Sequence, residues 1–512
     1  MNDRIVLSSV AGGILLASCA LVARAEGVRC AASPITLKPV DLVRELRERA
    51  DRRISQIRAV PNMQIPAAAP RRYLSSATGD DASDGLTPET AWRTVERLNR
   101  ETLAPGTFVL FERGGVYRGS VKATTGVTLT AYGSGEKPHL FASPKNGADP
   151  KRWERTENPG IWAYDVGHDD VGTLVFDDGK SCAEKILLKT DPKTGKKSDL
   201  KTWRPFVTYR DIAGDLRFWH DYYPKGTGKV YLCSERNPGE RFKTIEFNVC
   251  KHGVAVAGDG VTVDNLSIAY VGAHGVGAGT CRNLTVKNCE FAWIGGSIMS
   301  EAFMNRPFPT RFGNAVEIFG GCDGYVVSNC YIRQVFDAGI THQFGIHEGL
   351  GLKRFDQRNI VYTRNVLENC NYSIEYFLTV PNGNQSLMEN VRITDNLMFD
   401  AGLGFCEQRP DPWVATHIMA YSAPNKNRAR DFLIKGNVMC GARRTLVEIA
   451  STLPAPDGGT SLPRMEDNLL VGKSGGLFGY VTDAKAKNLR FDEDCQTVLD
   501  ARGRGNKVVV IP

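Results

Sequence analysis

The feature that most constrains this chain is a strand-turn-strand pattern that recurs between about Val254 and Gly479. Its middle part has seven versions: VTVDNLSI from Val261, LTVKNCEF from Leu284, YVVSNCYI from Tyr325, IVYTRNVL from Ile360, VRITDNLM from Val391, FLIKGNVM from Phe432 and MEDNLL from Met465. Alternating apolar and β-branched residues predict strands with one buried side, and the Asn, Asp or Gly that follows is typical of a tight turn. The pattern therefore predicts a coil of stacked strands rather than a helical solenoid.

Alignment of these segments predicts a stacked column at the turn. Its members are Leu266, Cys289, Cys330, Asn365, Asn396, Asn437 and Asn468. Identical amides stacked at strand spacing form a ladder of hydrogen bonds. Neighbours in the column are 23 to 41 residues apart, whereas three short strands need about 20 to 25 residues per turn. The surplus predicts loops on one face, where a functional site is expected.

The first 25 residues are typical of a secretory signal. Residues 5–22 form an uncharged apolar run behind Arg4, and Ala23-Arg24-Ala25 matches an A-x-A cleavage site. We therefore expect a bacterial protein exported to the periplasm or the medium. Two alternatives stay open. Leu16 to Cys19 resembles a lipoprotein box, which would attach the chain to a membrane through a lipid at Cys19, and an uncleaved anchor needs a run of about 18 residues, which this segment just reaches.

Charge and cysteine content restrict the partners. The chain carries a formal charge of +7, which is compatible with an acidic glycan. An exported chain without a basic cluster is not expected to bind nucleic acid. The 13 cysteines include no CxxC or Cys/His grouping typical of zinc. Cys281 and Cys322 are candidates for a disulfide in an oxidising compartment, because each directly precedes a strand.

Two segments before the repeat predict helices. Residues 41–58 carry apolar side chains at helical spacing, namely Leu42, Leu46, Ala50, Ile54 and Ile57. This favours a helix packed on the strands or a solvated stalk over a partner-binding helix, followed by a proline-rich linker that completes residues 26–70. A second helix is expected to begin at Thr87 as N-cap, with Pro88 at its first position, and to cover the open end of the first coil within residues 71–149.

The motifs of this second region resemble a known family. YLSSATGDDASDG from Tyr73, TPETAWRTV from Thr87, FVLFERGGVYRG from Phe108 and AYGSGEKP from Ala131 are similar to the amino-terminal block of secreted proteins of the pectin-lyase-like superfamily. The resemblance implies an all-β fold, a right-handed parallel β-helix of three-strand coils with an N-terminal capping helix. The superfamily contains polysaccharide lyases, glycoside hydrolases and uronate epimerases, so the fold alone does not select a reaction.

The presence or absence of the repeat predicts the boundaries of the remaining regions. Residues 150–250 do not repeat and predict a small insertion of antiparallel strands with turns at Gly226 and Gly239. Its tryptophans belong either to a core or to a sugar contact. The main coils occupy residues 251–482, and residues 483–512 are expected to cap their end.

The strand that opens each coil predicts an outward row of carboxylates. Its inward centres are Val276, Val316, Ile340, Ile374, Phe405, Val447 and Leu477. The two-residue period of a strand turns the next residues outward, namely Gly277, Glu317, Thr341, Glu375, Cys406, Glu448 and Phe478. Glu317 and Glu375 are two coils apart, which separates their backbones by roughly 9 to 10 Å. Inclined side chains bring this pair into the range of about 6.5 to 9.5 Å used by inverting glycosidases. They are the predicted catalytic pair, with a solvated strand face as the alternative.

Neighbouring polar residues extend the candidate site. Asp337 is either a groove-edge carboxylate or a turn cap, and His342, with inward parity, is either a core histidine or a proton-transfer group. His274 resembles part of the Gly-His-Gly motif of polygalacturonase-like hydrolases, although Ala273 replaces its first glycine. The other residues expected to bind substrate are Arg311, Asn314, Thr341, Gln343, Glu448 and Trp413.

Three functions stay open. The first is an exported glycoside hydrolase that cleaves a polysaccharide or oligosaccharide with two carboxylates. The second is a lyase or uronate epimerase, which needs a basic residue and either Arg or Ca²⁺ to neutralise the sugar carboxylate. The third is a glycan-binding surface protein without catalysis. The outward row contains Glu but neither Arg nor Lys, which favours the hydrolase, for which no metal or other cofactor is expected. Asp80, Asp81 and Asp84 are interpreted as turn formers rather than calcium ligands.

Overall fold

The computed structural model describes residues 39–222, 226–299, 309–346, 354–381, 383–411, 414–421, 427–484 and 487–512. The chain divides into two units, Met1–Lys38 and Pro39–Pro512. The predicted signal peptide and lipoprotein box lie outside the described residues. No helix among the described residues is long and apolar enough to cross a membrane.

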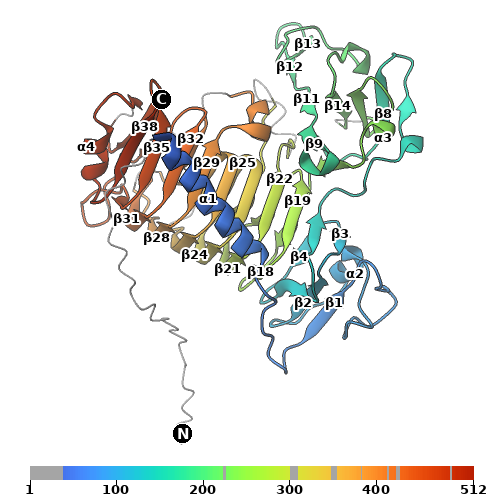
Figure 1. Ribbon diagram of the computed structural model, residues 1–512, viewed down its shortest axis with the longest axis horizontal. Helices are drawn as coiled ribbons and strands as arrows, with labels where there is room; N and C mark the ends of the chain where they lie inside the picture. The colour runs from blue at the N-terminus through green and yellow to red at the C-terminus, as the bar shows by residue number, and fades with distance from the viewer. Residues whose placement is uncertain are drawn as a thin grey trace, which may run out of the picture. The chain divides into compact units, whose positions relative to one another are not determined.

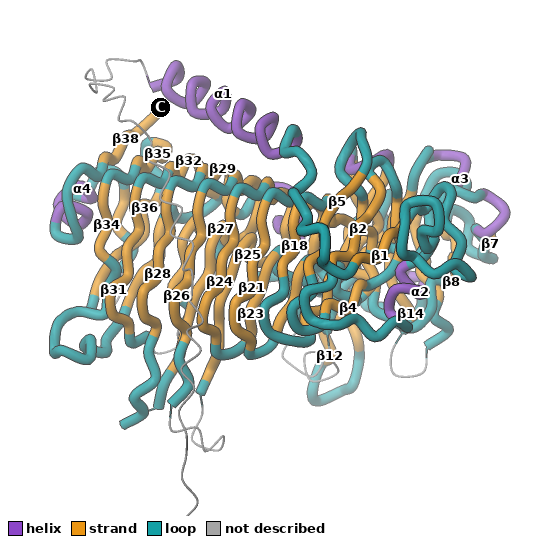
Figure 2. The backbone as a smooth tube through the Cα atoms, turned by 90° about the horizontal axis from the view of Figure 1, so that it is seen from below, coloured by secondary structure: helices purple, strands orange, loops and turns teal. Residues whose placement is uncertain are grey.

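Short strands stack in parallel on three faces of a β-helix (Figures 1 and 2), as the repeat predicts. The first face is a ten-stranded sheet. In spatial order its strands are β1 (Arg71–Leu74), β2 (Phe108–Glu112), β5 (Thr128–Tyr132), β18 (Thr262–Asp264), β21 (Cys281–Lys287), β24 (Cys322–Ser328), β26 (Gln357–Thr363), β28 (Met388–Thr394), β31 (Ala429–Lys435) and β34 (Arg464–Glu466).

The second and third faces are joined into one sheet by two long strands, β25 (Tyr331–Gly345) and β27 (Val366–Thr379), which turn the corner between them. The other strands of the second face are β3 (Val116–Arg118), β6 (His139–Phe141), β19 (Ser267–Val271), β22 (Glu290–Ile294), β29 (Leu397–Ala401), β32 (Val438–Ala442), β35 (Leu469–Lys473) and β38 (Lys507–Ile511). The other strands of the third face are β4 (Val121–Ala123), β17 (Val254–Val256), β20 (Val276–Ala278), β23 (Val316–Phe319), β30 (Thr416–Ala420), β33 (Val447–Ala450) and β36 (Leu477–Thr482), with β37 (Leu489–Arg490) antiparallel to β36.

The predicted asparagine column is present between the first and second faces. Each amide donates to the next along the coil: Asn365 to Asn396 (3.0 Å), Asn396 to Asn437 (2.9 Å) and Asn437 to Asn468 (3.0 Å). The ladder continues one coil beyond the prediction, since Asn468 donates to Asn506 at 2.9 Å. The segment expected to be a terminal cap contains the short strand β37 and a short helix, α4 (Cys495–Asp500), and then adds the strand β38 to the second face.

The helix predicted over residues 41–58 is α1 (Pro39–Arg58), and it packs along the outside of the second face (Figure 1). All five of its predicted apolar side chains are buried, in a cluster with Val366, Leu397, Val438 and other residues of the second face. Arg47 adds ion pairs with Glu368 (3.0 Å) and Asp400 (2.5 Å). The helix is thus packed on the strands, which excludes the solvated stalk.

The helix expected after Thr87 is wrong in position. Thr87 and Thr90 close a turn, while the helix α2 (Val95–Asn99) begins eight residues later with Thr94 as its N-cap. Asp81 accepts the backbone N–H groups of Arg93 (2.8 Å) and Thr94 (3.0 Å), which fixes the two residues directly before α2. Val95 and Leu98 of α2 are buried in the main core, as expected of a cap on the first coil.

The insertion consists of small, mainly antiparallel sheets with their own cores. The five-stranded sheet contains β7 (Glu154–Arg155), β8 (Ile161–Asp165), β15 (Lys229–Cys233), β14 (Arg217–Asp221) and β11 (Glu184–Lys185). The three-stranded sheet contains β10 (Ser181–Cys182), β9 (Val171–Phe176) and β16 (Ile245–Val249). The two-stranded sheet pairs β12 (Leu188–Thr190) with β13 (Lys197–Asp199). A short helix, α3 (Pro238–Arg241), follows β15. Trp153 is buried in this core, whereas Trp203 is exposed.

A buried ion pair inside the insertion is hydrogen-bonded to the segment of the β-helix that follows β22. Lys185 contacts Asp170, and both side chains are almost fully buried. Asp170 also accepts the backbone N–H of Ile298 at 2.7 Å, and Ser297 donates to the Asp170 carbonyl at 3.0 Å. These contacts hold the insertion beside the strands that carry the candidate site.

Candidate functional site

The register of the third face confirms the spacing predicted for the carboxylates. Glu317 on β23 lies opposite Thr341 on β25, and Thr341 lies opposite Glu375 on β27. The row continues through Met419 on β30 to Glu448 on β33. Glu317 and Glu375 are therefore two coils apart, and Glu375 and Glu448 are again two coils apart.

The predicted row is wrong at two positions. The structure places Met419 and Tyr480 where the sequence predicted Cys406 and Phe478. Gly402 and Gly404, with φ of 82° and 80°, lead the chain into the 3-10 helix η6 (Gly404–Gln408), which contains Cys406. The coil's own strand begins only at Thr416, because η6 and the segment after it are an excursion from the coil.

Three side chains from neighbouring coils converge on one oxygen of Glu317. The amide of Asn314 donates to Oε2, and the amide of Gln343 does so at 3.3 Å. Nδ1 of His274 lies 3.0 Å from the same oxygen. Asn314 is also fixed, since its Oδ1 accepts the backbone N–H of Ala338 at 2.7 Å. The sequence-predicted residues Asn314, Gln343 and His274 are thus brought together around Glu317.

His274 is a neutral acceptor in this contact. Its Nδ1 accepts the backbone N–H of Asn314 at 3.1 Å, which leaves the ring proton on Nε2. Burial lowers the pKa of His274 to about 4, and the ring stacks on His252 with centroids 5.1 Å apart. A neutral ring nitrogen next to Oε2 is attractive only when Glu317 carries a proton. Burial raises the pKa of Glu317 to about 7, partly offset by the hydrogen bonds from Asn314 and Gln343.

Asp337 is a carboxylate held by an arginine. It occupies a β-bulge of β25, where the register with β27 shifts between Val335 and Ala338, and bulges re-aim side chains in this way. Arg409 donates to Asp337 at 2.7 Å and to both oxygens of Asp411 at 3.0 Å. Burial raises the pKa of Asp337 to about 6, while Arg409 lowers it. Asp337 is therefore a buried ion-pair partner beside the row rather than a turn cap.

Glu375 has the least compensated environment of these carboxyls. Its side chain receives no hydrogen bond from any residue within the described ranges, although only 6% of the residue is exposed. Burial raises its pKa well above the ordinary value, and the charge of Asp337 raises it further. Glu375 is thus held as a neutral acid next to an ionised neighbour, an arrangement typical of proton donors.

Glu448 and Thr341, the other polar members of the row, are both buried but differ in their hydrogen bonds. Glu448 accepts the hydroxyl of Thr445 at 2.8 Å, and burial raises its pKa. Thr341, between the two predicted catalytic residues, is fully buried, and its hydroxyl has no hydrogen-bond partner among the residues that the structure describes.

Two of the predicted site residues have structural roles instead. His342 lies inside the coil, where Nδ1 is 2.8 Å from the hydroxyl of Tyr362 and burial lowers the pKa to about 3. Arg311 is also buried and donates to the carbonyls of Gly296 (2.6 Å) and Gly172 (2.8 Å), which ties the insertion to the β-helix. Neither side chain is placed to touch a substrate. Trp413, the remaining predicted contact, lies outside the described residues.

Sequence reasoning missed Arg409, Asp411 and Tyr372. Arg409 and Asp411 follow η6 in the segment before β30, and their side chains form two hydrogen bonds with each other. The local sequence R-x-D is the signal that could have indicated this pair. Tyr372 is 3% exposed and packs against Ala338 and Met419. Only the fold places them next to Asp337 and Glu375.

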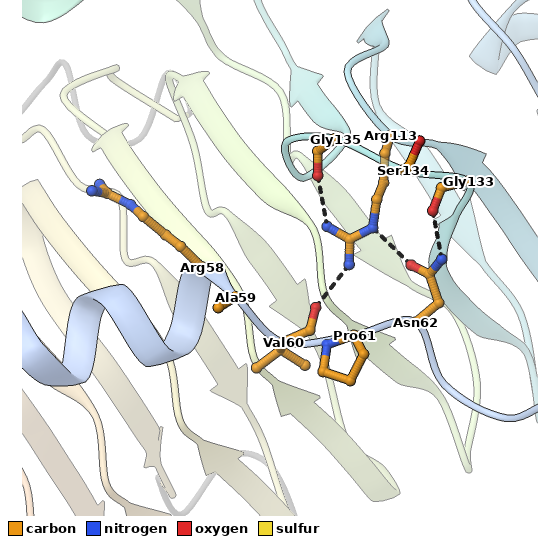
Figure 3. A pocket seen from close by; sticks show the side chains of 9 residues that line it. All are labelled: Arg58, Ala59, Val60, Pro61, Asn62, Arg113, Gly133, Ser134 and Gly135. Atoms are coloured by element: carbon orange, nitrogen blue, oxygen red, sulfur yellow. Dashed lines mark hydrogen bonds between the residues drawn. The ribbon is translucent and has the colours of Figure 1, made fainter.

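A pocket lies away from the carboxylate row, between the end of α1 and the first coil (Figure 3). Its volume is about 330 Å³. Arg113 donates there to Asn62 (2.7 Å), Val60 (2.9 Å) and Gly135 (3.2 Å). These bonds hold the linker after α1 in place, so the guanidinium of Arg113 and the amide of Asn62 are already engaged.

The predicted turn role agrees with the contacts of Asp80 and Asp84 but is wrong for Asp81, which accepts the backbone N–H groups of Arg93 and Thr94 just before α2. Asp80 accepts the N–H of Ala82 at 3.1 Å and Asp84 that of Leu86 at 3.0 Å, both two residues ahead. Over the described parts of the chain, no group of three or more His, Cys, Asp or Glu side chains is arranged to hold a metal ion. Cys281 and Cys322 are stacked in register on β21 and β24 as free thiols.

Comparison with known proteins identifies the architecture. Residues 240–406 match the family model "Right handed beta helix region". A curated relative, lacto-N-biosidase of Bifidobacterium longum subsp. longum, is 35% identical over 208 residues, which are 38% of this chain and 12% of that protein. The chain thus spans about an eighth of the length of this relative.

The solved structures with a similar backbone arrangement have a lower sequence identity to this chain. The GH136 lacto-N-biosidase of Eubacterium ramulus is 13% identical, with a TM-score of 0.32 over 86% of this chain and 68% of that one. The Family 28 exopolygalacturonase of Yersinia enterocolitica is 12% identical, with a TM-score of 0.28 over 82% and 76%. Such low scores decide nothing about the reaction. The family model and the three parallel faces together show that the chain forms a right-handed parallel β-helix.

Proposed function

We propose that this chain is an exported glycoside hydrolase that cleaves a polysaccharide or oligosaccharide with inversion. The observation that carries the proposal is Glu375, a buried carboxyl without a hydrogen-bond donor in the described structure, two coils from Glu317 in one row. The name of the curated relative, a glycosidase, supports the same class of reaction.

The different environments of the two carboxyls suggest their roles. Glu375 is the proton donor, because burial and Asp337 both disfavour its charge. Glu317 is the base, because the amides of Asn314 and Gln343 support its charge and keep its pKa lower. Asp337 is a positioning residue, since its negative charge helps to keep Glu375 protonated, while its partner Arg409 offsets part of that effect.

The reaction then balances as follows. Glu375 gives its proton to the glycosidic oxygen while the bond from that oxygen to the anomeric carbon breaks. A water on the opposite face of the ring forms the new bond to this carbon and gives a proton to Glu317. His274 stays neutral through this step, because its Nδ1 accepts the backbone N–H of Asn314 and burial lowers its pKa. Return of both carboxyls to their starting protonation completes the cycle.

The first test is hydrolysis of neutral and acidic polysaccharides, followed through new reducing ends and the ultraviolet absorbance of unsaturated uronate. Reducing ends without absorbance, with an inverted anomer detected by NMR, are expected. Glu375→Gln should lose at least a thousandfold in kcat on natural substrates and much less on aryl glycosides with good leaving groups, which need no proton. Glu448→Gln is the matched control, since Glu448 lies in the same row but has its own donor in Thr445, and it should keep kcat.

The pH profile tests the assignment of the base. With Glu317 as base, kcat/KM should rise as the pH increases through about 7, the pKa of Glu317. Addition of azide to Glu317→Ala should restore turnover by supplying a nucleophile. Unsaturated uronate as the product would show a lyase instead, and full activity of Glu375→Gln would refute the catalytic pair.

A further inference from the structure

A second outward row lies beside the carboxylates on the third face. In register, it consists of Phe319 on β23, Gln343 on β25, Phe377 on β27 and Tyr421 directly after β30. These residues stand two positions after Glu317, Thr341, Glu375 and Met419, which places the second row roughly 7 Å along the strands from the first.

The aromatic rings of this row face outward. Their inward neighbours Ile318 and Tyr376 belong to the main core, whereas Phe319 is 50% exposed and Tyr421 is 47% exposed. Phe377 is half-buried and meets Tyr421 edge to face, with centroids 5.6 Å apart. Exposed aromatic rings are costly in water, so two exposed rings and one half-buried ring in a single row indicate a surface that a ligand covers.

The polar member links this row to the proposed chemistry. Gln343 lies between Phe319 and Phe377, each about 4.8 Å away along the β-helix, and its amide nitrogen donates to Oε2 of Glu317 at 3.3 Å. A ligand that covers the aromatic row therefore lies directly beside Glu317.

The charge of this surface restricts the ligand. The outward positions of residues 316–319, 340–345, 373–379 and 416–421 include no lysine or arginine. Arg409 is already engaged by Asp337 and Asp411, and Arg444 lies 3.7 Å from Glu448 at the other end of the row. A uronate would therefore bring a negative charge next to Glu317, and none of the residues that the structure describes offers an unpaired cation there to balance it.

The geometry points to Phe319, Gln343, Phe377 and Tyr421 as a binding platform for uncharged pyranose rings. The apolar C–H faces of such rings stack on aromatic side chains, while their hydroxyl groups bind amides such as that of Gln343. The platform deepens the proposed function: it assigns a subsite and a substrate class to the hydrolase, and its location beside Glu317 rests on that function.

The test is calorimetric titration of the full chain carrying Glu375→Gln, which prevents cleavage. The probes are neutral oligosaccharides of glucose, of xylose, and of galactose with N-acetylglucosamine, and oligogalacturonides of equal length as the acidic counterpart. Phe319→Ala and Tyr421→Ala should each weaken binding of the best neutral probe tenfold or more. Tyr421→Phe keeps the ring and should stay within threefold. Trp203→Ala, an exposed aromatic in the insertion, is the matched control and should bind unchanged.

The outcomes separate the platform from the catalytic proposal. Loss of binding in the ring variants, in a chain whose parent form cleaves no polymer, would support the platform and refute the hydrolase. Cleavage with an unchanged KM in Phe319→Ala and Tyr421→Ala would refute the platform and leave the hydrolase standing. Tighter binding of oligogalacturonides, or binding of none of the probes, would also overturn the platform.

Discussion

Replacement of Glu317 by Gln should change how the stability of the protein depends on pH. Burial raises the pKa of Glu317 to about 7 from its ordinary value of 4.5. Between these values the folded protein keeps the proton while the unfolded chain releases it. The free energy of unfolding of the parent protein therefore falls as the pH rises from 4.5 to about 7. This contribution is fully present below pH 4.5 and is lost above pH 7.

The size of the effect follows from the same two values. One pKa unit corresponds to about 1.4 kcal/mol, so the loss amounts to about 3 kcal/mol. Gln can place its amide oxygen where Oε2 accepts from Asn314 and Gln343, and it stays uncharged at every pH, so it resembles the protonated acid. Glu317→Gln should therefore gain about 3 kcal/mol over the parent protein between pH 4 and pH 8.

Thermal unfolding at the two pH values measures this gain. An entropy of unfolding of about 2 cal/mol/K per residue converts it to a relative rise in Tm of about 3 °C for a domain of this length. Glu89→Gln, at an exposed position outside the site, is the control and should show no such change. An equal Tm difference between Glu317→Gln and the parent protein at both pH values would refute the buried, protonated state of Glu317.

Other predictions concern the fold that supports the site. Asn396→Ala should lower the free energy of unfolding by about 2 to 4 kcal/mol in denaturant titration, because it interrupts the amide ladder and leaves buried groups unpaired. A loss below about 1 kcal/mol would mean that the ladder contributes little to stability. Asp170→Ala should cost about 3 to 5 kcal/mol by leaving the buried charge of Lys185 without its partner, and Lys185→Met in the same chain should recover part of that loss. Leu46→Ala should cost about 2 to 5 kcal/mol if α1 is an integral part of the structure, and faster proteolysis near the N-terminus should accompany it.

Several features of the site could be predicted because they depend on one strand at a time. The two-residue period of a strand decides which side chain points inward, and this was sufficient to place Glu317, Thr341, Glu375 and Glu448 in one row. The same parity indicated that His342 faces the core, where the structure finds it. The prediction failed at Cys406, because an apolar segment in a 3-10 excursion has the composition of a strand.

The partners of the carboxyls could not be predicted in the same way. Arg409 reaches Asp337 over 72 positions in sequence, and Arg311 is removed from the site by carbonyls of the insertion and of the turn after β22. Neither contact leaves a local pattern, since the distance in sequence bears no relation to the distance in space.

The sequence by itself determined the coil, the asparagine ladder, the buried face of α1 and the outward parity of the glutamates, since each depends on a short periodic pattern of side chains. Only the tertiary structure decided which buried carboxyl receives hydrogen bonds or an ion pair and which receives neither. Burial, the Arg409 ion pair and the amides around Glu317 come from separate coils and from the excursion before β30, and they raise the pKa values of Glu317, Asp337 and Glu375 to different extents. Electrostatic energy depends on distance and desolvation in space, so these differences arise only once the coils have stacked.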